Sequence, residues 1–360
     1  MEIVNFYSGP SILPKEVIEQ AKDGLVNFAD TGLSILEISH RSKEFLAVME
    51  ECVSLAKKLM NLGEDYEVIF MQGGASSQFH LIPQNFLSTE QFANYIDTGT
   101  WANAAFNQAK LFGKVHLAAS SADKNYNYIP KSFDINSAGR YLHITTNNTI
   151  FGTQYHFQQS TQKHFETALP MIADMSSDIL SRDFNYTDFD LIYAGAQKNI
   201  GTSGTTLVAI KKSFLETSNS NLPAMCDYKV HVKNGSMKNT PAVFPIYITY
   251  LTLKRIEKTG LQNIFIENNK KAQLLYECID SSSLFTGTVD REDRSKMNVC
   301  FVMNDKNLEL KFSAFAKEKG IVGIEGHRSV GGFRASIYNA MPLKGVMYLI
   351  DIMKEFEQRT

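Results

Sequence analysis

Several features that would assign a function at once are scarce in this sequence of 360 residues. The four cysteines stand far apart, with no CxxC pair and no histidine nearby at metal-ligand spacing: Cys52, Cys226, Cys278 and Cys300. The eight histidines are scattered as well. We therefore expect free thiols, most of them buried, and neither a disulfide framework nor a metal site.

Charge of one sign and long apolar runs are missing too. The 36 Lys and Arg residues nearly balance 38 Asp and Glu residues, so the chain has no bulk attraction to nucleic acid or anionic lipid. No run approaches the roughly 20 apolar residues of a membrane span, and the first residues, MEIVNFYSGPSILP, have neither a basic region nor a long apolar region. The sequence predicts a cytoplasmic protein that binds neither nucleic acid nor membranes.

The length of the chain exceeds what one hydrophobic core usually supports, which is about 250 to 300 residues. Strand-like and helix-like segments alternate from residue 44 to 210, a pattern typical of an α/β domain. We predict a large domain over 16–260, with a mostly parallel, mixed seven-stranded sheet flanked by helices. Its strands are expected at 66–72, 92–99, 114–120, 140–147, 169–177, 189–197 and 205–211.

The order of elements changes after the large domain. A polar loop is expected at 226–243, followed by helices at 244–260 and 261–282. Short strands and helices then alternate to the end of the sequence. This pattern predicts a smaller α+β domain over 261–360, joined by residues 1–15.

Four features follow the predicted strands, at the edge where open α/β sheets bind ligands. The turn at 73–78, GGASSQ, could bring backbone N–H groups close to a phosphate, although a plain connection is the alternative. Trp101, the only tryptophan, could stack on a planar ring or simply fill a cleft. Asp174 ends an apolar strand and needs a cationic partner, from the protein or from a ligand.

Lys198 is the fourth feature, and a lysine is costly at the end of a buried strand. A phosphate cup, a stacking aromatic, a carboxylate for a ring nitrogen and a lysine for an aldehyde are together the four needs of pyridoxal 5′-phosphate. Burial would lower the pKa of the lysine, as condensation with an aldehyde requires. The sequence thus points to this cofactor before any family is considered.

The chain also resembles a known family over essentially its whole length. The segments SGPSILP, ISHRSKEF, QGGASSQF, GTW, ADMSSDILSR, YAGAQKNIG, NTP and GHRSVGGFRASIYNA are similar to those of the phosphoserine aminotransferases, a class-V family of fold-type-I pyridoxal-phosphate enzymes. GAQKN and GHRSVGGFRASIYNA are the most specific of these segments.

This resemblance implies a role for each cofactor-binding residue. Lys198 would hold the cofactor covalently, Asp174 would pair with its ring nitrogen, and Trp101 would stack on the ring. The remaining contacts would come from Ala75, Ser76 and Gln197 to the phosphate, from Thr153 near the ring oxygen, and from Asn239 and Thr240 of a second subunit to the phosphate. Many members carry an arginine where this sequence has Ser76, so neutral donors would have a larger share of phosphate binding here.

The same resemblance implies a substrate with an anion at each end. Arg334 would bind the α-carboxylate, and a second anion pocket would be formed by His40 and Arg41, from the other subunit, with His327 and Arg328. Without the family resemblance, charges on a solvated surface are the alternative for this second group of residues.

The implied reaction moves the amino group of L-glutamate to 3-phosphohydroxypyruvate, giving O-phospho-L-serine and 2-oxoglutarate, in a homodimer with active sites at the subunit interface. Serine biosynthesis is the implied pathway, with pyridoxine biosynthesis as a second use.

Three other functions are compatible with parts of this pattern. An aminotransferase of small uncharged substrates would not need four cations in the second pocket. A cysteine desulfurase needs a reactive cysteine on a mobile loop, and only Cys226 lies in an evident loop. A non-catalytic binding protein would have no use for both Lys198 and Asp174.

Overall fold

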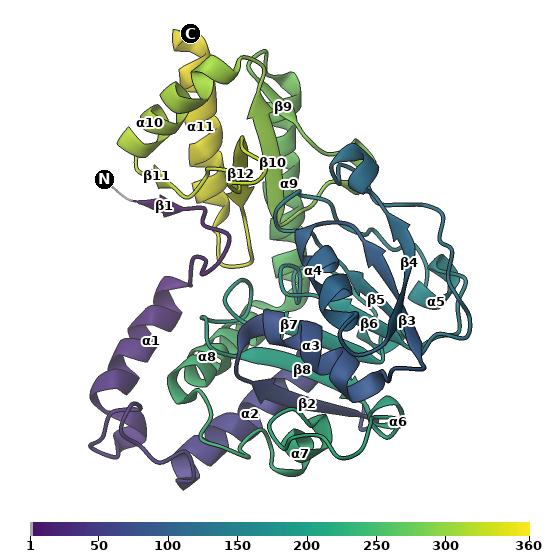
Figure 1. Ribbon diagram of the computed structural model, residues 1–360. Helices are drawn as coiled ribbons and strands as arrows, with labels where there is room; N and C mark the ends of the chain where they lie inside the picture. The colour runs from purple at the N-terminus through teal and green to yellow at the C-terminus, as the bar shows by residue number, and fades with distance from the viewer. Residues whose placement is uncertain (1–2) are drawn as a thin grey trace.

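The computed structural model describes residues 3–360, and its central feature is a seven-stranded sheet (Figure 1). The strand order is β2-β8-β7-β6-β5-β3-β4, and β8 alone runs antiparallel to its neighbours. The strands span Tyr66–Met71 (β2), Phe92–Asp97 (β3), Lys114–Ser120 (β4), Leu142–Thr145 (β5), Met171–Asp174 (β6), Leu191–Gly195 (β7) and Thr206–Lys211 (β8). The predicted fold class, a mostly parallel mixed sheet of seven strands, is confirmed.

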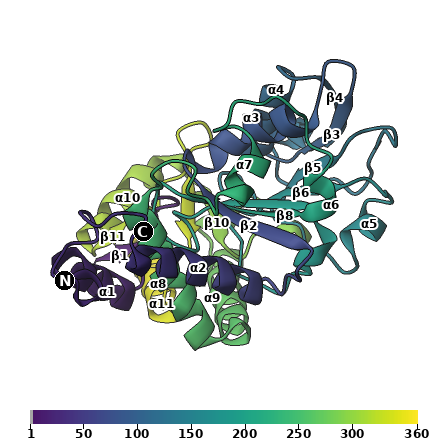
Figure 2. The ribbon, with the colours of Figure 1, turned by 90° about the horizontal axis from the view of Figure 1, so that it is seen from below.

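Apolar side chains on both faces of the strands require a layer of helices on each side. In β2, Val68 and Phe70 enter one core, whereas Ile69 and Met71 enter the other, because successive residues of a strand point to opposite faces. Figure 2 shows α3 and α4 on one side of the sheet and α2 and α8 on the other. These helices span Lys43–Leu59 (α2), Gly74–Phe86 (α3), Thr100–Ala109 (α4) and Val243–Thr259 (α8).

Smaller helices complete this part of the chain. They are α1 (Lys15–Val26), α5 (Thr161–His164), α6 (Lys212–Leu215) and α7 (Tyr228–Lys233). Helix α7 lies within 226–243, which the sequence predicted to be a loop. Asp227 caps α7 by accepting from the Lys229 backbone N–H, and the buried Tyr228 donates its hydroxyl to Gln78 on α3. The loop prediction was wrong because this short helix is fixed by a tertiary contact that its polar composition does not reveal.

The C-terminal part has its own sheet and core. Three antiparallel strands in the order β12-β10-β9 pack against long helices, and β1 pairs in parallel with β11. The elements are β1 (Val4–Asn5), α9 (Leu261–Ser281), β9 (Phe285–Gly287), β10 (Asn298–Met303), α10 (Glu309–Glu318), β11 (Ile321–Val322), β12 (Phe333–Ser336) and α11 (Leu343–Arg359). Gly260 separates α8 from α9, and the division into two domains at this residue remains a prediction.

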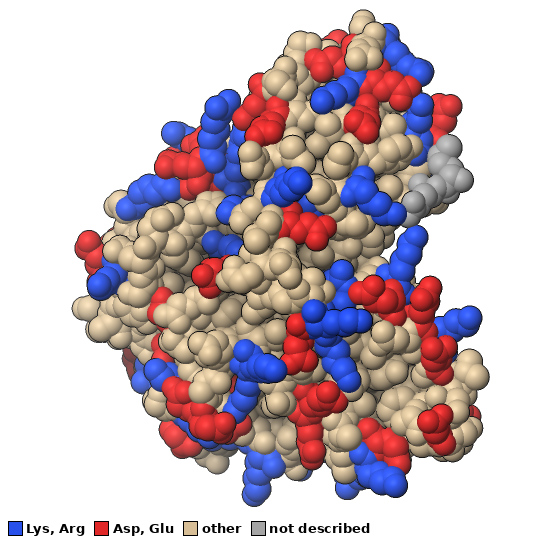
Figure 3. Space-filling view, turned by 180° about the vertical axis from the view of Figure 1, so that it is seen from behind, with Lys and Arg blue, Asp and Glu red and all other residues tan. Residues whose placement is uncertain are grey.

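The surface reflects the balanced composition. On the face seen in Figure 3, Lys and Arg side chains are interspersed with Asp and Glu. Over residues 3–360, the helices are too short or too polar to cross a bilayer.

Candidate active site

The carboxyl ends of three neighbouring strands, β5, β6 and β7, meet at one edge of the sheet. Thr145 lies beside Asp174 in the register of the strands, and Asp174 lies beside Tyr193. A cavity of about 120 Å³ opens at this edge. Its lining brings together six of the residues that the sequence singled out: Ala75, Ser76, Trp101, Asp174, Gln197 and Lys198.

Lys198 occupies the turn that follows β7 and is half-buried, with its amine in the cavity lining. Its Nζ donates to Thr149 Oγ1 at 2.7 Å. Burial lowers the pKa of Lys198 to about 8, against the opposing effect of the Asp174 carboxylate and with a smaller contribution from the charge of Arg334. The amine therefore deprotonates far more readily than an ordinary lysine, which a nucleophile for an aldehyde requires.

Asp174 ends β6 and is buried beside this lysine. Its Oδ1 accepts two hydrogen bonds from Ser176, at 2.9 Å from the backbone N–H and at 2.6 Å from the hydroxyl. Burial raises the pKa of Asp174, while the Lys198 ammonium and the Ser176 bonds act in the opposite direction. A buried carboxylate in such a place needs a cationic partner, and a protonated ring nitrogen in the cavity would supply one.

The N-terminus of α3 forms another wall of the cavity. Gly73 and Gly74 precede and begin this helix with φ of 98° and 68°, in the left-handed region that glycine adopts without strain. Ala75 and Ser76 follow in its first turn, which contains no acidic residue. The N–H groups at this helix end and the positive end of its dipole favour a phosphate.

Trp101 lies in the first turn of α4 and lines the same cavity. Its side chain is 36% exposed, unusual for the only tryptophan of a chain with well-filled cores. A flat aromatic surface at the mouth of the cavity can stack on a planar ligand.

The structure does not place Thr153 at this cavity. Residues 148–153 form a tight reversal, in which the Asn148 N–H donates to Thr153 O and the Gly152 N–H donates to Asn148 O. The buried Thr153 hydroxyl accepts from Asn148 Nδ2 at 3.0 Å, and Thr149 lines the cavity in its place. The reversal turns Thr153 away from the cavity lining of this single chain, and its contact with the cofactor remains a prediction.

Five polar residues that the sequence did not single out also line the cavity: Thr145, Asn147, Thr149, Ser176 and Ser177. All of them end or directly follow β5 or β6. The carboxyl-end position was therefore a usable signal for them. The sequence offered no way to choose among several polar residues in a row.

The predicted substrate cations are divided between two locations. Arg334, on β12, is 8% exposed, and its Nη2 donates to Ser8 Oγ at 2.8 Å while its Nη1 donates to Thr149 O at 3.4 Å. The Arg334 Nε has no partner. Through Thr149, this guanidinium lies close to the Lys198 amine.

The other four cations lie outside the cavity lining of this single chain. His327 and Arg328 are exposed in the connection between β11 and β12, with His327 Nδ1 at 2.7 Å from Ser329 Oγ. His40 and Arg41 precede α2, where Arg41 Nε donates to His40 Nε2 at 3.4 Å. One chain does not bring these two pairs to the cavity.

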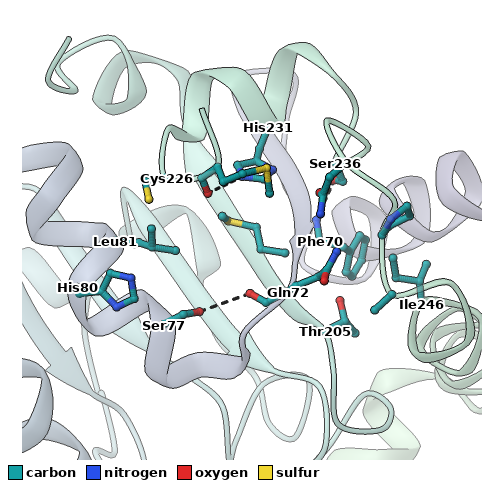
Figure 4. Close-up of a pocket in the computed structure, with 15 residues that line it drawn as sticks. Phe70, Gln72, Ser77, His80, Leu81, Thr205, Cys226, His231, Ser236 and Ile246 are labelled. Carbon is teal, nitrogen blue, oxygen red and sulfur yellow. Dashed lines mark hydrogen bonds between the residues drawn. The ribbon is translucent and has the colours of Figure 1, made fainter. Parts of the chain in front are cut away.

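Asn239 and Thr240 also lie away from Lys198. Thr240 O accepts from Gln72 Nε2 at 2.8 Å, and Asn239 lines a second cavity of about 190 Å³. Figure 4 shows this second cavity, to which Gln72 contributes from the connection between β2 and α3 and Ser77 from the first turns of α3. The turn that leads into α3 thus borders both cavities.

The cysteines fit the prediction of free thiols. All four are free, and Cys52, Cys278 and Cys300 are buried. Burial raises the pKa of Cys300 to about 12, which makes its thiol unreactive. Cys226 lines the second cavity and not the cavity of Lys198. Over residues 3–360, no group of three His, Cys, Asp or Glu side chains could hold a metal ion.

The site thus pairs a lysine with a carboxylate at the strand ends of this sheet, and comparison with known families shows to which class such a site belongs here. The profile of the class-V aminotransferase family matches residues 3–349. The chain therefore belongs to the class-V aminotransferase family.

Within this family the similarity is to phosphoserine aminotransferases, as the sequence predicted. The chain is 51% identical to the phosphoserine aminotransferase of Flavobacterium johnsoniae and 50% identical to that of Porphyromonas gingivalis, with 99% of both chains covered in each case. The solved phosphoserine aminotransferase from Bacillus circulans subsp. alkalophilus superposes with a TM-score of 0.95 at 44% identity, with 99% of both chains covered.

Two further solved phosphoserine aminotransferases bear on the cofactor. One, described with a Schiff base, has a TM-score of 0.95 at 43% identity and covers both chains fully. The other, from Trichomonas vaginalis with bound PLP, has a TM-score of 0.91 at 34% identity and covers 98% of this chain and 100% of its own. Family and fold together imply pyridoxal phosphate as the cofactor. An alanine–glyoxylate aminotransferase from Nostoc, at 16% identity, shares the fold alone.

Proposed function

We propose that this chain transfers the amino group of L-glutamate to 3-phosphohydroxypyruvate, forming O-phospho-L-serine and 2-oxoglutarate. The observation that carries the proposal is the pairing of a half-buried lysine and a buried carboxylate in one cavity, at the strand ends of a class-V aminotransferase. The product places the enzyme in L-serine biosynthesis, and a related phosphorylated substrate would give it a second use in pyridoxine biosynthesis.

The residues around the cavity fit pyridoxal 5′-phosphate. Lys198 offers a nitrogen of low pKa to the aldehyde, and Asp174 offers a carboxylate to the ring nitrogen. The helix end at Ala75 and Ser76, with Gln197, offers donors to the phosphate, and Trp101 offers its flat face to the ring. When bound, this cofactor supplies an electron sink for the pair of electrons that remains when a substrate carbon loses its proton.

Lys198 also has a second role, as the base that moves this proton. Its Nζ, held by Thr149, would act as a base toward the substrate carbon. A pKa near 8 suits an amine that would take up a proton from that carbon and give one back. Asp174, in its ionised form, keeps the ring nitrogen protonated throughout.

The cations give the proposed substrate its two anchors. Arg334 lies close to the Lys198 amine, with an unpartnered Nε, and binds the α-carboxylate. His327 and Arg328 bind the distal anion, which is a carboxylate in glutamate and a phosphate in the other substrate. A planar carboxylate and a tetrahedral phosphate at a similar distance from the α-carbon can bind in turn to one such pocket.

A second copy of this chain would complete the site. His40 and Arg41 follow a segment that exposes Leu33 and Leu36, with 47% and 66% of their surfaces accessible. Large apolar side chains in such a position favour burial in a protein interface. We propose that this segment, and the segment of Asn239 and Thr240, enter the active site of the partner in a homodimer.

Spectra of the half-reaction test the proposal. Purified protein loaded with pyridoxal 5′-phosphate is mixed in turn with phosphoserine, glutamate, serine and alanine, and the visible absorption of the bound cofactor is followed. We expect phosphoserine and glutamate to convert the spectrum, and serine and alanine to do so far more slowly. Equal rates with serine and phosphoserine would instead indicate an aminotransferase of small uncharged substrates, and a protein without visible absorption would refute cofactor binding.

A further inference from the structure

Helix α9 carries two polar residues on its buried side, one turn apart. Asn268 and Lys271 are almost fully buried, between apolar residues of the same helix such as Ile264 and Leu275. Polar groups are costly in this position unless each donor finds an acceptor. The partners of these two side chains therefore show what they hold in place.

Lys271 holds the chain segment that follows β12. Its Nζ donates to three backbone carbonyls, those of Ile337, Tyr338 and Met341, at 3.0, 2.8 and 2.9 Å. An ammonium group has three N–H donors, so all of them are used. The segment 337–341 is thereby fixed to α9.

Asn268 begins a series of three buried asparagines that ends beside Lys198. Its Nδ2 donates to Asn339 Oδ1 at 2.8 Å, and the Asn339 backbone N–H donates to Asn199 Oδ1 at 3.0 Å. The Asn199 Nδ2 in turn donates to Ser177 O at 3.0 Å. Because a backbone N–H only donates, the orientation of the Asn199 amide is fixed. The residue next to Lys198 is thus tied to a helix 69 positions later in the chain.

The same segment supports Arg334. The Tyr338 hydroxyl donates to Ser8 O at 2.7 Å, and Ser8 Oγ accepts from Arg334 Nη2 at 2.8 Å. One side of α9 therefore sets the positions of two groups, the amine of Lys198 and the guanidinium of Arg334. In the proposed reaction, these two groups must meet the same substrate.

We propose that Asn268 and Lys271 are positioning residues, and that their contacts to residues 337–341 set the distance between Lys198 and Arg334. We call these two side chains the α9 clamp. This inference rests on the proposed function. Neither residue lines the cavity, so the clamp acts through the segment 337–341 and Asn199, and through Ser181 O, which also accepts from Asn268 Nδ2 at 2.8 Å. Small displacements of reacting groups are expensive, since about 1 Å can cost a factor of about 100 in rate.

The test compares Asn268→Ala with Asn263→Ala in the full chain. Asn263 lies on the same helix but is exposed, and it donates only to Thr259 O, so its variant is the matched control. Hydrogen exchange is measured without cofactor, and kcat and KM for glutamate are measured with pyridoxal 5′-phosphate. If Asn268→Ala does not fold, Asn268→Ser, which keeps a short donor, takes its place.

We expect Asn268→Ala to raise amide exchange in residues 196–200 and 337–341 by about tenfold, the factor that one lost buried hydrogen bond gives. Exchange in β2 and β8 should stay unchanged, and kcat should fall about tenfold while KM for glutamate rises severalfold. The control should match the unmodified protein in every measurement.

Two results would overturn the clamp. One is a rise in exchange that is equal in all strands, since that indicates a general loss of stability. The other is unchanged kcat and KM despite faster exchange at 196–200. A protein that binds no cofactor would refute the proposed function instead, and the exchange measurements would still decide whether the clamp fixes these segments.

Discussion

The turn after β7 contains a half-buried lysine and the middle of α9 a fully buried one, and the two lysines differ in what surrounds them. Lys271 gives all three of its N–H donors to backbone carbonyls, whereas Lys198 gives one to the neutral hydroxyl of Thr149 and faces a cavity. Burial lowers the pKa of both, to about 7 for Lys271 and about 8 for Lys198. A lowered pKa alone therefore does not separate a structural lysine from a reactive one. The number of acceptors and access to a cavity do.

Removal of the reactive lysine should have the largest effect. Lys198→Ala should abolish covalent attachment of pyridoxal 5′-phosphate and lower transamination by a factor of at least about 10³, because both the nucleophile and the proton carrier are lost. The fold should remain intact, since the amine has few protein partners. Absorption of the bound cofactor, the rate with phosphoserine and circular dichroism check these points. Appreciable turnover in this variant would disprove the role of Lys198.

Removal of the other lysine should have the opposite profile. Lys271→Met removes three buried hydrogen bonds, to the carbonyls of Ile337, Tyr338 and Met341, and we expect the free energy of unfolding to fall by about 3 kcal/mol. Attachment of the cofactor should persist wherever the variant is folded. Urea denaturation gives the first quantity and absorption the second. A variant as stable as the unmodified protein would show that the three hydrogen bonds have no net value.

The pKa of Lys198 predicts how attachment depends on pH. Only the neutral amine attacks an aldehyde, and its share falls tenfold for each pH unit below the pKa. The initial rate of attachment to cofactor-free protein should therefore rise from pH 6 to about 8 and then level off. Stopped-flow absorption from pH 6 to 10 measures this rate. A midpoint near 10, that of an ordinary lysine, would contradict the effect of burial.

The smallest effect on kcat is expected for Thr149 and Thr153, and it should differ between the two threonines. Thr149→Val removes the hydroxyl that accepts from Lys198, so we expect kcat to fall severalfold, up to about tenfold, as for one hydrogen bond to a charged group. Thr153→Val removes a hydroxyl that bonds only to Asn148, so kcat should be unchanged and stability slightly lower. If Thr153→Val gave the larger loss in kcat, the assignment of Thr149 to the site would be incorrect.

The sequence was most informative where a pattern depends on local chemistry. All seven strands of the large sheet were predicted, because each is an apolar run bounded by polar or glycine residues. Lys198, Asp174 and Trp101 could be found for the same reason, since each breaks the pattern of a strand end. These residues do share one cavity in the structure.

Features that depend on tertiary contacts were not accessible in this way. Helix α7 is short and polar, and the contact of Tyr228 with Gln78 that fixes it joins residues 150 positions apart. Thr149 and Thr153 are equally polar, and only the reversal of the chain between them decides which one reaches the cavity. Asn268 and Lys271 look like ordinary surface residues of a helix until their partners at 337–341 are known.

The pairing of β1 with β11 has a consequence for how the protein is made. Residues 4 and 5 are synthesised more than 300 residues before their partners, Ile321 and Val322. The segment between them and α1 also supplies Ser8, which bonds to Arg334, and Ser11, which donates to Lys198 O. Contacts of such long sequence separation form slowly. The contacts that Ser8 makes beside the cavity therefore form only after Arg334 has been synthesised, and a shorter nascent chain lacks them.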